Sequence, residues 1–133
     1  MDVAATFHHV GVACRDLDQE KMHWYAIGYV DDGNGFIDPN LGVKGIFLIG
    51  GGPRVELLSP LTKHSKVLSP WLERGIKMYH MAFEVDSLPK ALQDIDTKGG
   101  RTVIKPIPAV AFGGRQIAFC LLRNLMLIEF IQR

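Results

Sequence analysis

The strongest constraint on the fold is an internal repeat, because one pattern of residues runs through the chain twice. His9 opens the apolar stretch HVGVACRDL, and His80 opens the similar stretch HMAFEVDSL in the second half of the chain. Gly28 and Gly99 are separated by the same interval as the two histidines, and each follows a predicted helix that a glycine would end. The first half of each copy therefore matches the other in spacing as well as in residue type.

The two copies also end alike. Glu56 lies in VELL and Glu129 in LIEF. The interval between these glutamates is slightly longer than the interval between the histidines, and two extra residues in a hairpin of the second copy would account for the difference. One match of this kind would be chance. Four matches in the same order, in His, in the Leu that closes the HVGVACRDL and HMAFEVDSL stretches, in Gly and in Glu, indicate a duplicated unit. We therefore interpret the chain as two copies of one structural module.

Each copy is predicted to form a strand, a helix and three further strands. The first copy opens with a strand over residues 7–14, followed by a helix that Asp16 would cap. The helix of the second copy shows apolar residues at i, i+3, i+4 and i+7, namely Leu88, Ala91, Leu92 and Ile95. We therefore expect an α+β fold of two βαβββ modules, residues 1–60 and 77–133, joined by a linker at residues 61–76 in which Ser69-Pro70 would start a short helix.

The remaining elements follow from less regular patterns. Further strands are predicted near residues 43–49, 53–58, 101–105, 115–122 and 125–132. The Pro- and Gly-rich stretch 104–114, IKPIPAVAFGG, is interpreted as a loop that could edge a pocket. On the first helix, Leu17, Trp24 and Tyr25 are expected to form the buried side. The run 50–52 consists of glycine alone and is predicted to be a hairpin turn.

Strand alternation turns two histidines and two glutamates away from the helices. If Val10 packs beneath the first helix, its neighbour His9 must point to the opposite face of the sheet. The same alternation in the other strands gives a set of four side chains on that face: His9, Glu56, His80 and Glu129. These side chains would meet if the two modules pack about a pseudo-two-fold axis.

Such a set would offer two imidazole nitrogens and two carboxylates to a divalent metal ion. Nitrogen and oxygen donors without a thiolate suit Co, Ni, Zn, Mn or Fe, and they do not select one of these. A single His on a strand is more often a half-buried residue than a ligand, and a single Glu is usually solvated. The matched positions in two repeats favour the metal site over those interpretations.

The segments HHVGVACRDL, VELLSPL, YHMAFEVDSL and LIEF together resemble the vicinal oxygen chelate superfamily, which includes glyoxalase I, extradiol dioxygenases and bleomycin-resistance proteins. The resemblance covers nearly the whole chain and is greatest to the methylmalonyl-CoA epimerases. It implies a cupped, mixed eight-stranded sheet around a metal, with the helices on the outside and with His9, Glu56, His80 and Glu129 as the ligands. It also implies a homodimer that binds a small-molecule substrate.

The resemblance implies removal of a proton next to a carbonyl, in an acyl-CoA thioester or a similar acyl compound, and hence an isomerase or epimerase. Glu129 is the candidate to move the proton, and Glu56 is its counterpart in the other copy. Arg115 would hold an anionic substrate group or lie on the surface. Where some epimerases carry a catalytic Glu, this chain has Gly45. Two alternatives remain open: a glyoxalase-like lyase, and a metal-free binding or resistance protein.

Charge and composition narrow the other possibilities. A formal net charge of +1 gives no electrostatic basis for binding nucleic acid or an anionic membrane. No run of about 18 apolar residues is present, and the first residues lack the pattern of a signal peptide. Cys14 and Cys120 form no metal or redox spacing, so we expect reduced core residues and a cytoplasmic location.

Overall fold

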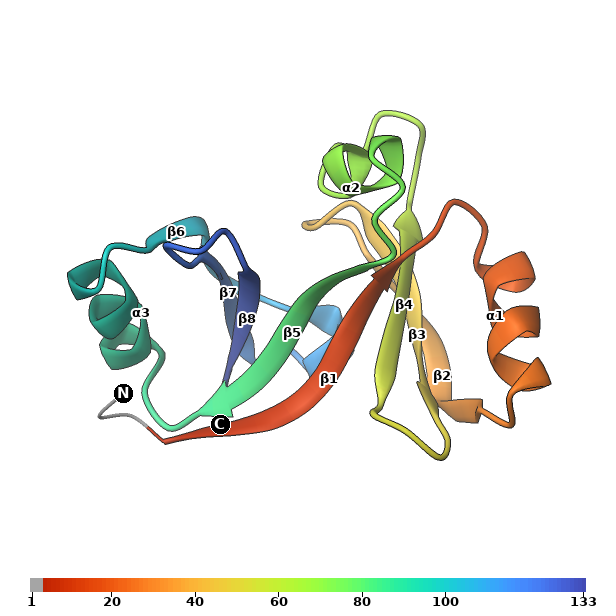
Figure 1. The fold of residues 1–133 in the computed structure, drawn as a ribbon, viewed down its shortest axis with the longest axis horizontal. Helices are drawn as coiled ribbons and strands as arrows, with labels where there is room; N and C mark the ends of the chain where they lie inside the picture. The colour runs from red at the N-terminus through yellow and green to blue at the C-terminus, as the bar shows by residue number, and fades with distance from the viewer. Residues whose placement is uncertain (1–3) are drawn as a thin grey trace. The chain divides into compact units, whose positions relative to one another are not determined.

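The computed structural model describes residues 4–133 and has an α+β fold with an eight-stranded mixed sheet and three α-helices (Figure 1). In chain order the elements are β1 (Ala5–Ala13), α1 (Leu17–Ala26), β2 (Val30–Asp38), β3 (Val43–Ile49), β4 (Val55–Pro60), α2 (Ser69–Glu73), β5 (Met78–Val85), α3 (Leu88–Thr97), β6 (Arg101–Pro108), a 3₁₀ turn (Val110–Phe112), β7 (Gln116–Leu121) and β8 (Leu127–Gln132). The order β-α-β-β-β occurs twice, which confirms the predicted repeat.

Two compact units divide the chain. The first, called the N-terminal unit, comprises residues 9–79. The second, called the C-terminal unit, comprises residues 80–133 together with the segment up to His8. Each unit has its own apolar core, so each can be understood from its own strands and its own helix.

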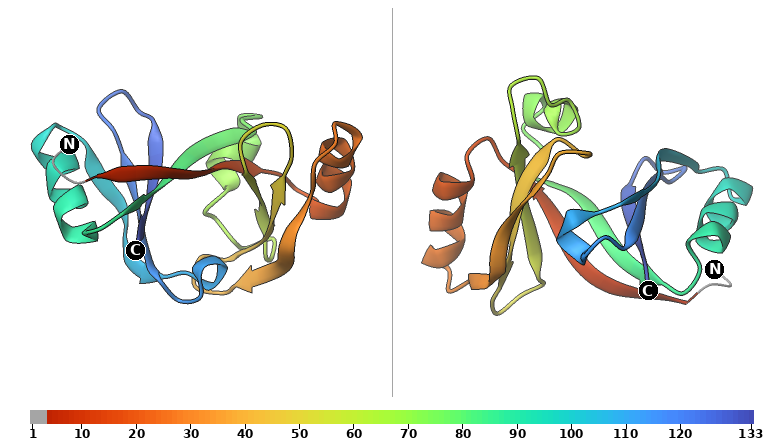
Figure 2. Two further views of the ribbon diagram at one scale, coloured as in Figure 1. Left: turned by 90° about the horizontal axis from the view of Figure 1, so that it is seen from below. Right: turned by 180° about the vertical axis from the view of Figure 1, so that it is seen from behind.

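In the N-terminal unit the strands lie in the order β2-β3-β4-β1 (Figures 1 and 2). β1 pairs in parallel with β4, and β3 pairs antiparallel with both β2 and β4. Helix α1 starts at Asp16, whose side chain accepts a hydrogen bond from the backbone N–H of Gln19 at 3.1 Å, as predicted. Leu17 and Trp24 of α1 pack on a core that consists of Val12, Tyr29, Ile46, Leu48, Val55 and Leu57.

The C-terminal unit has the corresponding strand order, β5-β8-β7-β6. Helix α3 is capped by the side chain of Ser87 and carries Pro89 in its first turn. It packs against β6, β7 and β8 over a core that contains Val85, Leu88, Ala91, Ala118, Cys120, Ile128 and Phe130. After α1 and α3 the chain passes through Gly28 (φ +92°) and Gly99 (φ +87°), the left-handed conformation that glycine tolerates best, so both predicted helix ends are confirmed.

Three local expectations need correction. Residues 104–108 are not loop but the second half of β6, an outer strand that tolerates Pro106 and Pro108 because its pairing with β7 is already irregular between Ile104 and Ile107. β2 was not located from the sequence. Tyr25 is exposed rather than buried, and its hydroxyl donates a hydrogen bond to the Asp31 carboxylate.

The connections agree with the patterns that predicted them. The glycines at residues 50–52 lie in the turn between the antiparallel strands β3 and β4. Helix α2 begins at Ser69 and has Pro70 in its first turn. Over residues 4–133, no helix has the length and apolar character needed to cross a membrane.

Both cysteines are buried free thiols, so their chemistry gives a first test of the fold. Burial raises the pKa of the Cys14 thiol to about 12 and that of the Cys120 thiol to about 11. Because the thiolate is the reactive form, we expect neither cysteine to react with an aromatic disulfide reagent at pH 8 while the protein is folded. Both should react quickly in concentrated guanidinium chloride, as followed by thiolate release. Rapid reaction of one thiol in the folded protein would contradict the packing described for it.

Candidate metal centre

In the N-terminal unit, the pairing of β1 with β4 brings a histidine against a glutamate. Gly11 of β1 lies opposite Glu56 of β4, and His9 precedes Gly11 by two residues, so both side chains lie on the same face of the sheet. The distance from His9 Nε2 to Glu56 Oε1 is 3.2 Å. The His9 side chain is fully buried, and 5% of the Glu56 side chain is exposed.

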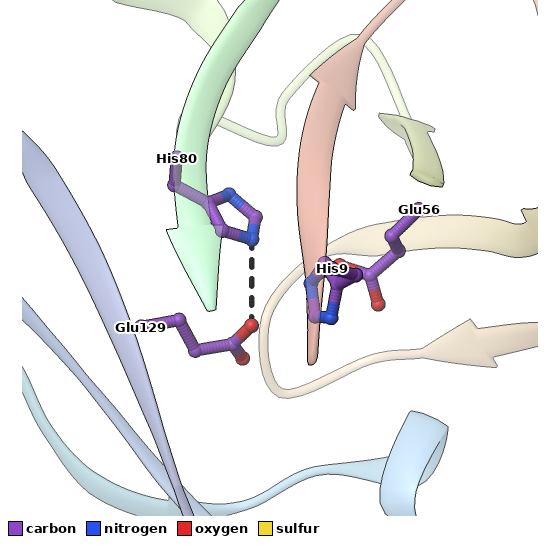
Figure 3. Close-up of side chains that lie close together, drawn as sticks. All are labelled: His9, Glu56, His80 and Glu129. Atoms are coloured by element: carbon purple, nitrogen blue, oxygen red, sulfur yellow. Dashed lines mark ion pairs between the residues drawn. The ribbon is translucent and has the colours of Figure 1, made fainter. Parts of the chain in front are cut away.

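The C-terminal unit repeats this arrangement with the same register. Ala82 of β5 lies opposite Glu129 of β8, and His80 precedes Ala82 by two residues. The distance from His80 Nε2 to Glu129 Oε1 is 3.4 Å, and Figure 3 shows this ion pair as a dashed line. Both side chains are buried. The structure therefore places each predicted His beside the predicted Glu of its own unit.

A small residue occupies the strand position opposite each glutamate, two residues after the histidine. Gly11 has no side chain and Ala82 has only a methyl group, so the neighbouring carboxylate can extend diagonally toward the imidazole two residues away. A larger side chain at either place would occupy the same face of the sheet as the ion pair. The sequence pattern of His, any residue and a small residue, present as HVG and HMA, thus leaves room for the carboxylate beside the imidazole in both units.

The chemistry of the donors fits a divalent metal ion. Among residues 4–133, His9 and Glu56 of the N-terminal unit, and His80 and Glu129 of the C-terminal unit, are buried side chains that could each offer one ligand atom to such an ion. Buried carboxylates are costly unless a nearby positive charge or a metal compensates them. Two imidazole nitrogens and two carboxylate oxygens suit the harder first-row metals, and they do not identify the ion.

Two aromatic residues of this face were missed by the sequence analysis. The ring of Phe47 in β3 lies 5.2 Å from the imidazole of His9, and the ring of Phe119 in β7 lies 5.1 Å from the imidazole of His80, as measured between ring centroids. Both contacts are edge-to-face. The repeat could have revealed them, because Phe is the third residue of GIFLI in the first copy and of IAFCL in the second.

Arg115, the predicted substrate-binding residue, already has partners within the C-terminal unit. Its Nη1 lies 2.9 Å from Oε2 of Glu84 and donates a longer hydrogen bond, 3.4 Å, to the backbone oxygen of Gln132. The guanidinium also lies over the ring of Phe112, at 5.7 Å from the centroid. A role for Arg115 in substrate binding therefore stays a prediction, and it would compete with an existing ion pair.

Gly45 cannot be replaced by a larger residue without rearrangement. A Cβ atom there would lie 2.7 Å from the backbone oxygen of Leu57 and 2.7 Å from the ring of Phe36. This position thus supplies neither an acid nor a base. It borders an open cavity of about 660 Å³ in the N-terminal unit, lined by Arg15, Asp16, Leu17, Asp18, Gly35, Phe36, Ile37, Lys44 and Gly45.

Comparison with known proteins finds a matching family and related sequences. The sequence model of the Glyoxalase/Bleomycin resistance protein/Dioxygenase superfamily matches residues 8–119. Mitochondrial methylmalonyl-CoA epimerase of Homo sapiens is 27% identical over 108 residues, which are 80% of this chain and 61% of the human protein. The chain thus spans about three fifths of the length of that relative.

Two solved structures resemble the whole chain. A hypothetical protein of Bacillus halodurans C-125 matches with a TM-score of 0.81 and 26% identity, covering 98% of this chain and 95% of that one. A variant of the Streptomyces coelicolor methylmalonyl-CoA epimerase, in complex with 2-nitronate-propionyl-CoA, matches with a TM-score of 0.78 and 25% identity, covering 97% of this chain and 95% of that one.

The ion pair of Arg115 provides a test through its pH dependence. The hydrogen bond from Arg115 lowers the pKa of the Glu84 carboxyl below its ordinary value of 4.5. A lowered folded-state pKa gives stability that is present above the unfolded value and is lost as the pH falls through the folded value. Because the pair is partly solvated, we expect Glu84→Gln to lower the free energy of unfolding at pH 7 by about 0.5–1 kcal/mol.

Urea denaturation at pH 7 and pH 3.5 would measure this effect. The stability difference between the wild type and Glu84→Gln should shrink at pH 3.5, because this pH lies below the ordinary pKa of 4.5 and protonation of the unfolded chain then removes part of the stability that the ion pair gives. Glu73→Gln, which neutralises an exposed carboxylate at the end of α2, would control for the loss of a charge in general. A difference that is the same at both pH values would assign the loss to packing rather than to the ion pair.

Proposed function

The chain belongs to the glyoxalase/bleomycin resistance/dioxygenase superfamily, and from this premise we propose that it is a divalent-metal-dependent isomerase or epimerase. Its reaction would remove a proton next to a carbonyl, in an acyl-CoA thioester or a similar acyl compound. The observation that carries the proposal is the buried His–Glu pair, which recurs in the same strand register in both units. The relative in Homo sapiens, named as a methylmalonyl-CoA epimerase, supports the choice of substrate.

Both pairs would bind one ion jointly, so that His9, Glu56, His80 and Glu129 are its ligands. The equivalence of the two pairs supports this arrangement, because a duplicated module contributes the same donors twice. Burial of all four side chains supports it as well, since an ion would compensate the carboxylates. When bound, a divalent ion supplies Lewis-acid stabilisation of negative charge on the substrate oxygens. Co, Ni, Zn, Mn and Fe remain candidates.

A carboxylate of the site would move the proton. Glu129 is the first candidate and Glu56 its counterpart, because each is a buried carboxylate that lies beside an imidazole of its own unit. In the reaction, the C–H bond next to the carbonyl breaks, its electron pair moves toward the carbonyl oxygen, and the proton passes to the carboxylate. Return of a proton to the other side of the carbon would give the epimer.

Gly45 favours a second candidate function, a glyoxalase-like lyase. Epimerisation by two groups needs a proton acceptor on one side of the carbon and a donor on the other, and position 45 contributes neither. A metal-free binding protein is the remaining alternative, and elemental analysis together with the effect of a chelator on thermal stability would separate it from both enzymes. A homodimer and a cytoplasmic location, both expected from the sequence, stay predictions.

Exchange of the substrate proton with solvent tests the enzymatic proposal. In D₂O with added Co²⁺, the protein should catalyse deuterium incorporation next to the carbonyl of acyl-CoA thioesters, as followed by NMR. His80→Ala removes one imidazole donor and should slow the exchange by about 100-fold or more. His23→Ala, an exposed residue of α1, is the matched control and should exchange at the wild-type rate. Equal exchange by His80→Ala and the wild type would reject the site.

The cavity beside Gly45 bears on the acyl-CoA part of the proposal. Arg15 and Lys44 both line it, both are exposed, and neither forms an ion pair with another residue of the described chain. The two acidic residues of the lining contact other groups: Asp16 caps α1, and the carboxylate of Asp18 lies 4.0 Å from Nζ of Lys21. We expect the two cations to contact phosphate groups of the coenzyme A portion.

A truncated substrate isolates this contact. The double variant Arg15→Ala/Lys44→Ala should raise KM for an acyl-CoA by about tenfold, as judged from charge-assisted hydrogen bonds at a solvated site. KM for the N-acetylcysteamine thioester of the same acyl group should not change, because that substrate has no phosphate. Equal increases for both thioesters, or no increase for the acyl-CoA, would show that these cations do not contact the phosphates.

A further inference from the structure

Phe47 contacts the imidazole of His9 and Phe119 contacts that of His80, in the same edge-to-face arrangement. We propose that these two phenylalanines are positioning residues, which hold the imidazoles of His9 and His80 in the orientation that metal binding requires. This inference rests on the proposed metal site, and it adds a role for the strands β3 and β7, which carry none of the four ligands.

Strand register fixes the place of each ring. In the antiparallel pair of β3 and β4, Phe47 lies directly opposite Glu56, and in the pair of β7 and β8, Phe119 lies directly opposite Glu129. Residues opposite each other project from the same face, with Cβ atoms about 4.5–5.5 Å apart. Each phenylalanine is therefore adjacent to the carboxylate of its unit and on the same side of the sheet as the imidazole.

The geometry of the contact is the same in both units. The ring planes of His9 and Phe47 make an angle of 75°, and those of His80 and Phe119 an angle of 88°. Edge-to-face packing is the arrangement that the charge distribution of aromatic rings favours. The neighbours of each imidazole thus include a carboxylate near Nε2 and an aromatic ring at a steep angle to its plane.

These contacts matter for a metal-binding histidine because an imidazole can rotate about its Cβ–Cγ bond. A histidine that must bind a metal needs the ring turned so that one nitrogen faces the ion, and residues that fix this orientation contribute to affinity without touching the metal. Leucine at these positions would preserve apolar volume but would lose the perpendicular contact.

Phe119 is buried and Phe47 also contacts the ring of Phe36, but both lie on the face of the sheet that carries the glutamates. Neither Phe47 nor Phe119 belongs to the apolar clusters beneath α1 and α3. The comparison is Phe83, which also makes an edge-to-face contact, with Phe7 at 5.9 Å, but packs against the cluster beneath α3. Phe83 therefore serves as the matched control: an aromatic residue of the same sheet that faces the helix rather than a histidine.

The test compares Phe47→Leu, Phe119→Leu and Phe83→Leu for Co²⁺ affinity, as measured by competition with a chromophoric chelator. Each of the first two variants should bind Co²⁺ about 10–100-fold more weakly than the wild type, the range typical of residues that orient metal ligands. Because the two His–Phe contacts are equivalent, the two variants should lose similar amounts of Co²⁺ affinity. Phe83→Leu should lower the thermal unfolding temperature of the metal-free protein without changing Co²⁺ affinity.

A second readout, on the metal-free protein, keeps this inference distinct from the metal proposal. In NMR spectra of the histidine rings, Phe47→Leu should broaden or shift the His9 resonances and leave those of His80 unchanged, and Phe119→Leu should do the reverse. If the wild type binds no metal but the spectra respond in this way, the metal site fails and the positioning role stands. If the wild type binds Co²⁺ and the leucine variants match it in affinity and in spectra, the positioning role is wrong.

Discussion

The parallel pairing between the first and last strands of each unit sets the position of every group at the candidate centre. In β1 and β4, as in β5 and β8, the glutamate lies opposite the residue two places after the histidine. Since side chains two residues apart share a face, this register alone brings a carboxylate and an imidazole to the same side of the sheet. A slip of one residue would turn the glutamate beneath a helix, where its charge would have no partner.

The apolar faces hold that register in place. Val55 and Leu57 flank Glu56 and pack beneath α1, while Ile128 and Phe130 flank Glu129 and pack beneath α3. Burying the alternate residues on the helix side therefore obliges the glutamates to point the other way. A buried ionisable pair contributes little stability by itself. The free energy needed to bury these charged side chains therefore comes from the two apolar cores rather than from the pairs.

Alternation along single strands was enough to predict the faces of His9, His80, Glu56 and Glu129, because that pattern needs no knowledge of neighbouring strands. Contacts across strands were not predictable in the same way. The positions of Phe47 and Phe119 beside the histidines depend on the register of β3 and β7. The ion pair of Arg115 depends on Glu84, which is distant in the sequence. β2 escaped prediction because VDDGNGFID is polar and irregular, as an outer strand with a shift in register can be.

The two copies differ in residue type two positions before the matched phenylalanines, at Gly45 and Ile117. In the N-terminal unit Gly45 lies opposite Leu58, and at the equivalent place of the C-terminal unit Ile117 lies opposite Ile131. Ile117 is fully buried, whereas Gly45 adjoins the cavity that Arg15 and Lys44 line. If the chain acts on an acyl-CoA, as proposed, the orientation of that unsymmetrical substrate would have to come from positions where the two copies differ, and Gly45 and Ile117 are such a pair.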